Sequence, residues 1–129
     1  MNNNLSDTEE LTISKTNAET EIETEKQVIL HCTVKLDRFT HIRIWPTTYL
    51  QCSETGYQSK LLHAINIPFT PNMKRISSGL SNFTLIFGGL PNNCKQFDFI
   101  EESLSDKYPF YAKAIIRNQM DVYYLEVQY

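Results

Sequence analysis

Apolar and polar residues alternate along much of the chain, and the longest alternating run covers residues 27–36. A period of two sustained over this length is typical of a β-strand that buries one face. We therefore predict a strand at 27–36 whose other face, with His31 and Thr33, is the polar one. The apolar face of this strand would consist of Val28, Leu30, Cys32, Val34 and Leu36.

Other segments of the chain repeat this pattern over shorter lengths. Residues 82–87 place Phe83, Leu85 and Phe87 on one side, and the segment 97–101 reads Phe-Asp-Phe-Ile-Glu. Both are rich in aromatic and branched residues, which favour strands. Weaker strand patterns lie at 11–14, 39–45, 47–52, 57–66, 110–117 and 121–129.

Turn residues separate these runs and indicate how they connect. The polar turn 53–56 ends in glycine and would join 47–52 to 57–66 as a hairpin. Residues 118–119 would likewise join 110–117 to 121–129 as an antiparallel pair. The segments 66–81 and 103–109 are expected to be loop, with an edge of the fold near the first of them. A short helix at 60–65 is the alternative to a strand there, and Pro68 would end it.

Seven to nine short strands with regularly spaced turns, and no helix of ordinary length, predict an all-β protein. The expected fold is an antiparallel immunoglobulin-like β-sandwich. The chain has 129 residues, a length that fits one domain. We expect residues 1–10 to form a flexible acidic N-terminal segment and residues 11–129 to form a single β-sandwich domain.

Charge is concentrated at the beginning of the chain. Residues 1–27 carry seven acidic residues against two lysines, whereas residues 28–129 carry ten basic and eight acidic residues. The body is therefore almost neutral, which argues against nucleic acid or a membrane surface as a partner. There is neither a basic and then apolar leader nor an apolar run of membrane-spanning length. These features predict a soluble, cytoplasmic protein.

Three cysteines, Cys32, Cys52 and Cys94, form an odd set without a Cys-x-x-Cys pair. Such a set predicts reduced, unpaired thiols rather than a disulfide framework. Cys32 and Trp45 are spaced like the first Cys and the Trp of an immunoglobulin domain. Cys94 lies in a turn without a Tyr two residues before it, so no antibody-type disulfide is expected.

No pattern of residues indicates catalysis, a metal or a cofactor. The three histidines, His31, His41 and His63, have no spacing typical of metal ligands. The acidic residues Asp98 and Glu102 would share a strand face, but their surroundings are polar and turn-like. Neither a nucleophile elbow nor a phosphate-binding glycine loop is present. We expect no catalytic residue, no metal site and no cofactor, and hence no enzyme.

Aromatic residues accumulate near the C-terminus. Because neighbours on a strand face opposite sides, either Phe110 or Tyr111 should point outward, and either Tyr123 or Tyr124. Exposed tyrosines supply rigid contact area at interfaces. We therefore name Tyr111, Tyr123 and Tyr124 as candidate binding residues, with ordinary cross-strand packing as the alternative. A second aromatic group, Trp45 and Tyr49 with Tyr57 nearby, could form a stacking platform for a ligand.

The order of several motifs resembles a group of uncharacterised bacterial immunoglobulin-like β-sandwich modules. The resemblance covers roughly residues 20–117, and its motifs include Phe83-Thr-Leu-Ile-Phe-Gly-Gly-Leu-Pro and Phe97-Asp-Phe-Ile-Glu. It implies a β-sandwich and provides no catalytic residues. It also implies export, because such modules often begin secreted or lipid-anchored proteins, whereas this chain shows no leader.

The expected function is binding without catalysis. A protein or peptide partner would dock on an edge strand or on the exposed aromatic residues. The alternative is a small ligand or a carbohydrate stacked on the Trp45 group. A homodimer formed through an edge strand stays open as a further alternative.

Overall fold

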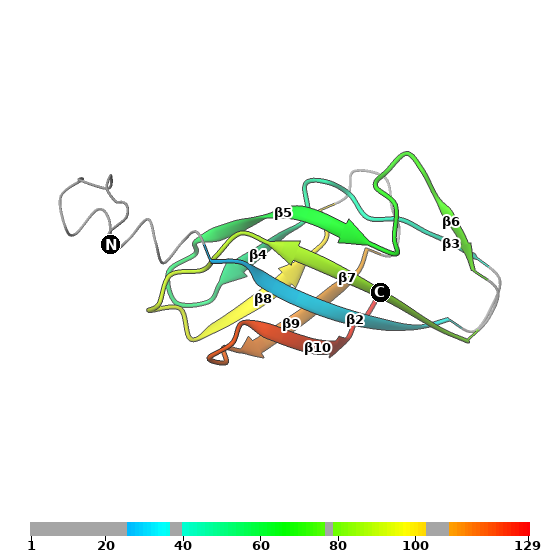
Figure 1. Cartoon of the computed structure of the whole chain (residues 1–129). Coiled ribbons are helices and arrows are strands. Elements are labelled where there is room, and N and C mark those ends of the chain that lie inside the picture. Colours follow the sequence, from blue (N-terminus) through cyan, green and yellow to red (C-terminus); the bar gives the residue numbers. More distant parts are fainter. Residues whose placement is uncertain (1–25, 37–39, 77–78, 103–108) are drawn as a thin grey trace, which may run out of the picture.

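The computed structural model describes residues 26–36, 40–76, 79–102 and 109–129 (Figure 1). These residues form nine strands and no helix, so the predicted all-β class is confirmed. None of them therefore forms a helix that could cross a membrane. The strands are β2 (Val28–Leu36), β3 (Thr40–Ile42), β4 (Tyr49–Cys52), β5 (Gln58–Ile65), β6 (Lys74–Ile76), β7 (Gly79–Phe87), β8 (Gln96–Ile100), β9 (Tyr111–Ile116) and β10 (Val122–Glu126).

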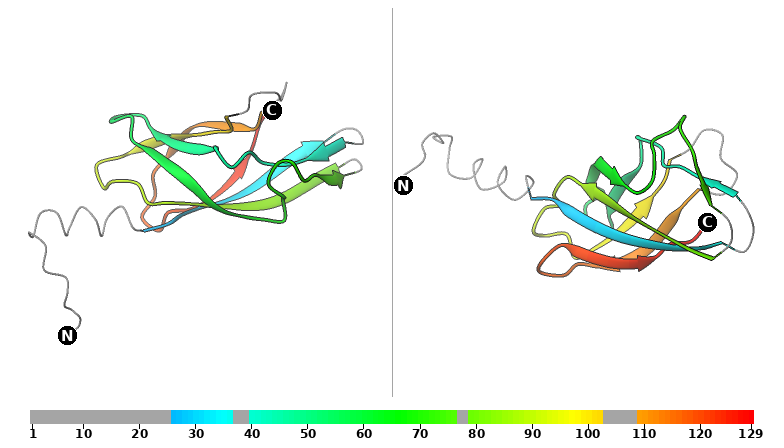
Figure 2. Two further views of the ribbon diagram at one scale, coloured as in Figure 1. Left: turned by 90° about the horizontal axis from the view of Figure 1, so that it is seen from above. Right: turned by 45° about the vertical axis from the view of Figure 1, so that its right-hand side comes forward.

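Seven strands form one sheet in the order β10-β2-β7-β5-β4-β8-β9. The sheet curls so that β5, β7, β2 and β10 form a front layer with β4, β8 and β9 behind them (Figures 1 and 2). Just beyond the end of β10, Gln128 forms an isolated antiparallel bridge with Tyr111 of the other end strand, β9. The fold is therefore a nearly closed sheet.

The prediction of an entirely antiparallel sheet is wrong for one pair of strands, β10 and β2. β10 runs parallel to β2, with Val122 opposite Ile29 and Glu126 opposite Thr33, so the sheet is mixed. The pairs β2–β7, β7–β5, β5–β4, β4–β8 and β8–β9 are antiparallel. A parallel neighbour cannot be recognised from the alternation within a strand, because alternation does not depend on the direction of the partner.

The alternating face predicted for residues 27–36 is confirmed in β2, whose even-numbered apolar side chains are all buried. β7 contributes Phe83, Leu85 and Phe87 to the same interior. From the back layer, Phe99 makes an edge-to-face contact with Phe87 at 6.2 Å between ring centroids. The core thus lies between the two layers, filled by the faces that the sequence pattern indicated.

The two predicted hairpins have different outcomes. β4 and β5 pair as expected, and Gly56 at the turn has a positive φ of 77° that favours glycine. The alternative helix at 60–65 is wrong, because these residues lie in β5. β9 and β10 do not pair as a hairpin: β9 pairs with β8, and β10 pairs with β2.

The segment 66–81, expected to be loop, contains β6 and the first residues of β7. β6 pairs with β3 in a separate two-stranded sheet at one end of the molecule (Figure 1). The expected segment 1–10, the strand at 11–14 and most of the loop at 103–109 lie outside the described residues.

Candidate binding groove

Tyr123 and Tyr124 are neighbours on β10 that face opposite sides of the sheet. Tyr123 is 5% exposed and makes an edge-to-face contact with Phe97 of β8, with 5.2 Å between the ring centroids. Tyr124 is 80% exposed. The structure therefore places Tyr123 in the core, where it cannot belong to an exposed surface, and leaves Tyr124 outside.

The hydroxyl of Tyr123 is fully used within the fold. It donates to the Asp121 carboxylate at 2.9 Å and accepts from the backbone N–H of Asn118 at 2.9 Å. Burial and the hydrogen bond to Asp121 raise the pKa of Tyr123 to about 12, although the Asn118 bond and the Arg117 charge act against the shift. The phenol therefore stays protonated well above the usual range for tyrosine.

Arg117 completes this cluster in the connection between β9 and β10. Its guanidinium binds both carboxylate oxygens of Asp121 and donates to the backbone carbonyls of Leu90, Pro91 and Cys94. The hydrogen bond to Asp121 raises the pKa of Arg117, against the opposing effect of burial. Every described contact of the cluster joins one part of the chain to another, so its role is structural.

On the outer face of the sheet, Tyr124 lies at one end of a row of side chains across four strands. The strand registers place Ile65 of β5 opposite Thr84 of β7, Thr84 opposite His31 of β2, and His31 opposite Tyr124. The imidazole of His31 stacks on the Tyr124 ring with 4.9 Å between centroids, and its Nδ1 hydrogen-bonds the Thr84 hydroxyl at 2.9 Å. The exposed tyrosine ring is therefore held in place from one side.

The next row contains polar side chains. Asn82 of β7, Thr33 of β2 and Glu126 of β10 are in register, and Thr33 donates to the Asn82 side-chain oxygen at 2.8 Å. After β5, Asn66 donates to the Asn82 backbone carbonyl.

The two rows border an open groove with a volume of about 680 Å³. This volume is within the range of small-ligand sites, at roughly 300–1,000 Å³. The groove is lined by His31, Cys32, Thr33, Asn66, Leu80, Asn82, Phe83, Thr84, Tyr124, Leu125 and Glu126.

Several groups in the groove remain available to a ligand. Among the described residues, neither the Tyr124 hydroxyl, the Glu126 carboxylate nor the Asn82 side-chain N–H groups have a hydrogen-bond partner. The Tyr124 ring offers the face that does not contact His31. An aromatic face, two acceptors and donors thus lie within one groove, where they can contact a partner.

The other candidate aromatic residues do not line this groove. Tyr111 is 40% exposed on β9, and its backbone forms the bridge to Gln128. Trp45 is half-buried, and the Arg43 guanidinium lies over its ring at 5.6 Å from the centroid, which covers one stacking face. Tyr49 is half-buried within β4. Of the candidate residues named from the sequence, Tyr124 is the one that lines this groove.

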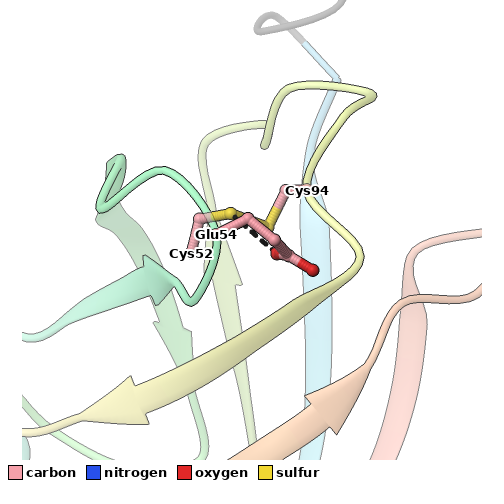
Figure 3. A group of neighbouring side chains, drawn as sticks. All are labelled: Cys52, Glu54 and Cys94. Carbon is pink, nitrogen blue, oxygen red and sulfur yellow. Dashed lines mark hydrogen bonds between the residues drawn. A yellow bond between two sulfur atoms is a disulfide. The ribbon is translucent and has the colours of Figure 1, made fainter.

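The expectation of three unpaired thiols is wrong for two cysteines. Cys52, at the end of β4, and Cys94 form a disulfide, with Glu54 beside it (Figure 3). The two sulfur atoms and a Glu54 oxygen lie within 4.8 Å of one another, a spacing that a metal site also requires. The sulfur atoms are bonded to each other, so they cannot serve as thiolate ligands in this state. Cys32 is buried and unpaired, and burial raises the pKa of its thiol to about 12.

Two acidic residues near β8 accept hydrogen bonds from backbone N–H groups. The Asp98 carboxylate accepts from the backbone N–H of Ala114 at 2.8 Å. Glu101 is buried, and its carboxylate accepts from the backbone N–H groups of Trp45 and Phe110. The sequence did not predict a buried Glu101, because its polar neighbours indicated a solvent-exposed turn.

The sequence also did not predict the groove, since its walls come from residues far apart in the chain. The only local signal was the polar face of the 27–36 strand, with His31 and Thr33. No protein-family model matches the chain, and comparisons with curated proteins and with solved structures give no match. The resemblance to bacterial β-sandwich modules is therefore supported by its sequence motifs alone.

Proposed function

We propose that this protein is a non-enzymatic interaction domain that binds a protein or peptide partner in the groove beside Tyr124. The observation that supports this most directly is an exposed aromatic ring that the fold itself holds in one position. The His31 ring and its bond to Thr84 restrict Tyr124 before any partner arrives. A restrained aromatic anchor loses little conformational freedom on binding, which favours affinity.

Exposed apolar side chains in and near the groove also favour a polypeptide partner. Leu80, which lines the groove, is 67% exposed on β7, and Ile65, at the other end of the Tyr124 row, is 53% exposed. Tyrosine anchors with apolar neighbours are common at protein interfaces. Among the described residues, the groove lining contains no lysine or arginine, the side chains that contact the phosphates of a polyanion.

A random peptide library displayed on phage and selected against the full chain tests the proposal. Selected peptides would be synthesised, labelled and titrated by fluorescence anisotropy. We expect Tyr124→Ala to weaken binding at least about tenfold, since aromatic anchors dominate such interfaces. The stability of this variant should change by no more than about 0.5 kcal/mol, because the side chain is on the surface.

Tyr57→Ala is the matched control, since Tyr57 is also an exposed tyrosine but does not line the groove. Equal affinity of the wild type and Tyr124→Ala, or failure to select any peptide, would contradict the proposal. Binding on a glycan array that depends on Tyr124 would instead support the alternative of a carbohydrate ligand. Dependence on Trp45 would support the stacking platform predicted from the sequence.

The fold classification and the cellular location are also proposals. The sequence motifs support an immunoglobulin-like fold related to the bacterial modules. The parallel β10–β2 pair, however, departs from an antiparallel sandwich. The cytoplasmic location expected from the sequence is also a proposal, and the Cys52–Cys94 disulfide is more usual in oxidising compartments. Thiol titration of protein purified from its native cells under alkylating conditions would decide between the two locations.

A further inference from the structure

The hydrogen-bonding pattern of β10 shows which of its backbone groups the fold uses. Ile29 donates to the Asp121 carbonyl, and Val127 donates to the Thr33 carbonyl, so the odd-numbered residues of this segment face β2. In a parallel ladder, alternate residues point both their N–H and C=O groups to the same side. The even-numbered residues of β10 therefore direct their backbone groups away from β2.

This second edge of β10 is satisfied at its two ends. At one end, Gln128 exchanges two backbone hydrogen bonds with Tyr111 of β9, at 2.9 and 3.0 Å. At the other end, the Asn118 side chain donates to the Val122 carbonyl. Between them, the N–H and C=O groups of Tyr124 and Glu126 and the N–H of Val122 have no partner among the described residues.

The side chains of Tyr124 and Glu126 border the groove, and their backbone groups form this free edge. We propose that the partner is an extended peptide that adds as a strand to β10 along Tyr124–Glu126, with its outward side chains beside the groove. This inference rests on the proposed function and specifies its binding mode. Strand addition obtains affinity from backbone hydrogen bonds and specificity from alternate side chains.

The side chains on this edge define the chemistry of the peptide. Glu126 is a carboxylate without a partner among the described residues, so a lysine or arginine opposite it would be favoured. Opposite Tyr124, two positions away on the same face, an aromatic or β-branched residue would pack best. The expected peptide therefore carries a basic residue and an aromatic or β-branched residue with one residue between them.

An N-methyl scan of a peptide selected on phage against the full chain tests this mode. N-methylation removes one amide donor at a time and leaves the side chains in place. We expect affinity to fall at least about tenfold at alternate amides and to change little at the amides between them. In amide hydrogen exchange, the N–H groups of Tyr124 and Glu126 should become protected when the peptide binds.

A proline pair provides a second test. Glu126→Pro removes an N–H that the fold leaves free, so the domain should fold and bind the peptide at least tenfold more weakly than Glu126→Ala, which removes the carboxylate alone. Leu125→Pro is the contrasting variant, because it removes an N–H directed at β2 and should destabilise the fold itself. Peptide binding with a flat N-methyl scan and no protection at Tyr124 would overturn strand addition while the proposed function survives. Failure to select any peptide would overturn both.

Discussion

Two polar regions adjoin on β10 and differ in how completely their groups are used. In the cluster of Arg117, Asp121 and Tyr123, donors and acceptors bind one another or the loop near Cys94. In the groove, Tyr124 and Glu126 leave a hydroxyl, a ring face and a carboxylate to solvent. Polar groups that hydrogen-bond one another within the fold stabilise it. Polar groups that have no partner within the fold are available to bind another molecule.

The largest expected effect comes from breaking the satisfied cluster. Asp121→Ala would leave the guanidinium of Arg117 without its carboxylate, and removing one member of a buried ion pair costs about 3–5 kcal/mol. The pair is slightly exposed to solvent, so we expect about 3 kcal/mol of lost unfolding free energy, measured by urea denaturation. Glu126→Ala, which removes a carboxylate from the groove, is the control and should cost less than about 0.5 kcal/mol. Equal losses of unfolding free energy in Asp121→Ala and Glu126→Ala would contradict this difference between the cluster and the groove.

The disulfide lies at the same end of the molecule, because the Cys94 carbonyl accepts from Arg117. Closing the loop between Cys52 and Cys94, a separation of 42 residues, should stabilise the fold by about 2–4 kcal/mol. Reductant should therefore lower the denaturation midpoint of the wild type. A Cys52→Ala, Cys94→Ala double variant should show no such response, and an identical response in both proteins would exclude a stabilising bond.

Removing one hydroxyl from each neighbouring tyrosine gives the closest comparison of the two regions. Tyr123→Phe leaves Asp121 and Asn118 each without one partner and should cost about 1–2 kcal/mol. Tyr124→Phe removes a hydroxyl that contacts only solvent and should change stability by less than about 0.5 kcal/mol. Urea denaturation of both variants measures their free energies of unfolding. We expect Tyr124→Phe to be the more stable of the two, and equal values would contradict the different roles of the two hydroxyls.

A further expected effect is a dependence on alkaline pH. The pKa of Tyr123 is raised from 10 to about 12, so the folded state holds this proton more tightly than the unfolded state. The resulting stabilisation is complete below pH 10 and is lost as pH rises from about 10 to 12. Other groups titrate in this range, so the test is the difference between the wild type and Tyr123→Phe. A difference that grows with pH would contradict the assignment.

The sequence predicted well those features that depend on local alternation. β2, β7 and β8 were recognised because each buries one face of a short segment. The β4–β5 hairpin was recognised because its turn is short and ends in glycine. Features that depend on distant partners were missed, above all the parallel β10–β2 pair.

The same reason explains the incomplete prediction of the candidate site. Alternation shows that one of Tyr123 and Tyr124 must point inward, but a shift of one residue exchanges the two. In the structure the buried ring is Tyr123, whose hydroxyl bonds Asp121 and Asn118 of the connection between β9 and β10, and the alternation pattern does not contain these contacts. The pairing of Cys52 and Cys94 was hidden by the odd cysteine, Cys32, which is buried apart from them.

We propose above that Tyr124 and the groove beside it form the binding surface. The most direct test of this proposal is a ¹H–¹⁵N chemical-shift titration of the full chain with a peptide selected from the random library. We expect the largest shifts at Tyr124, Glu126, His31 and Thr84. Shifts centred on Trp45 and Tyr49, with Tyr124 unchanged, would contradict it.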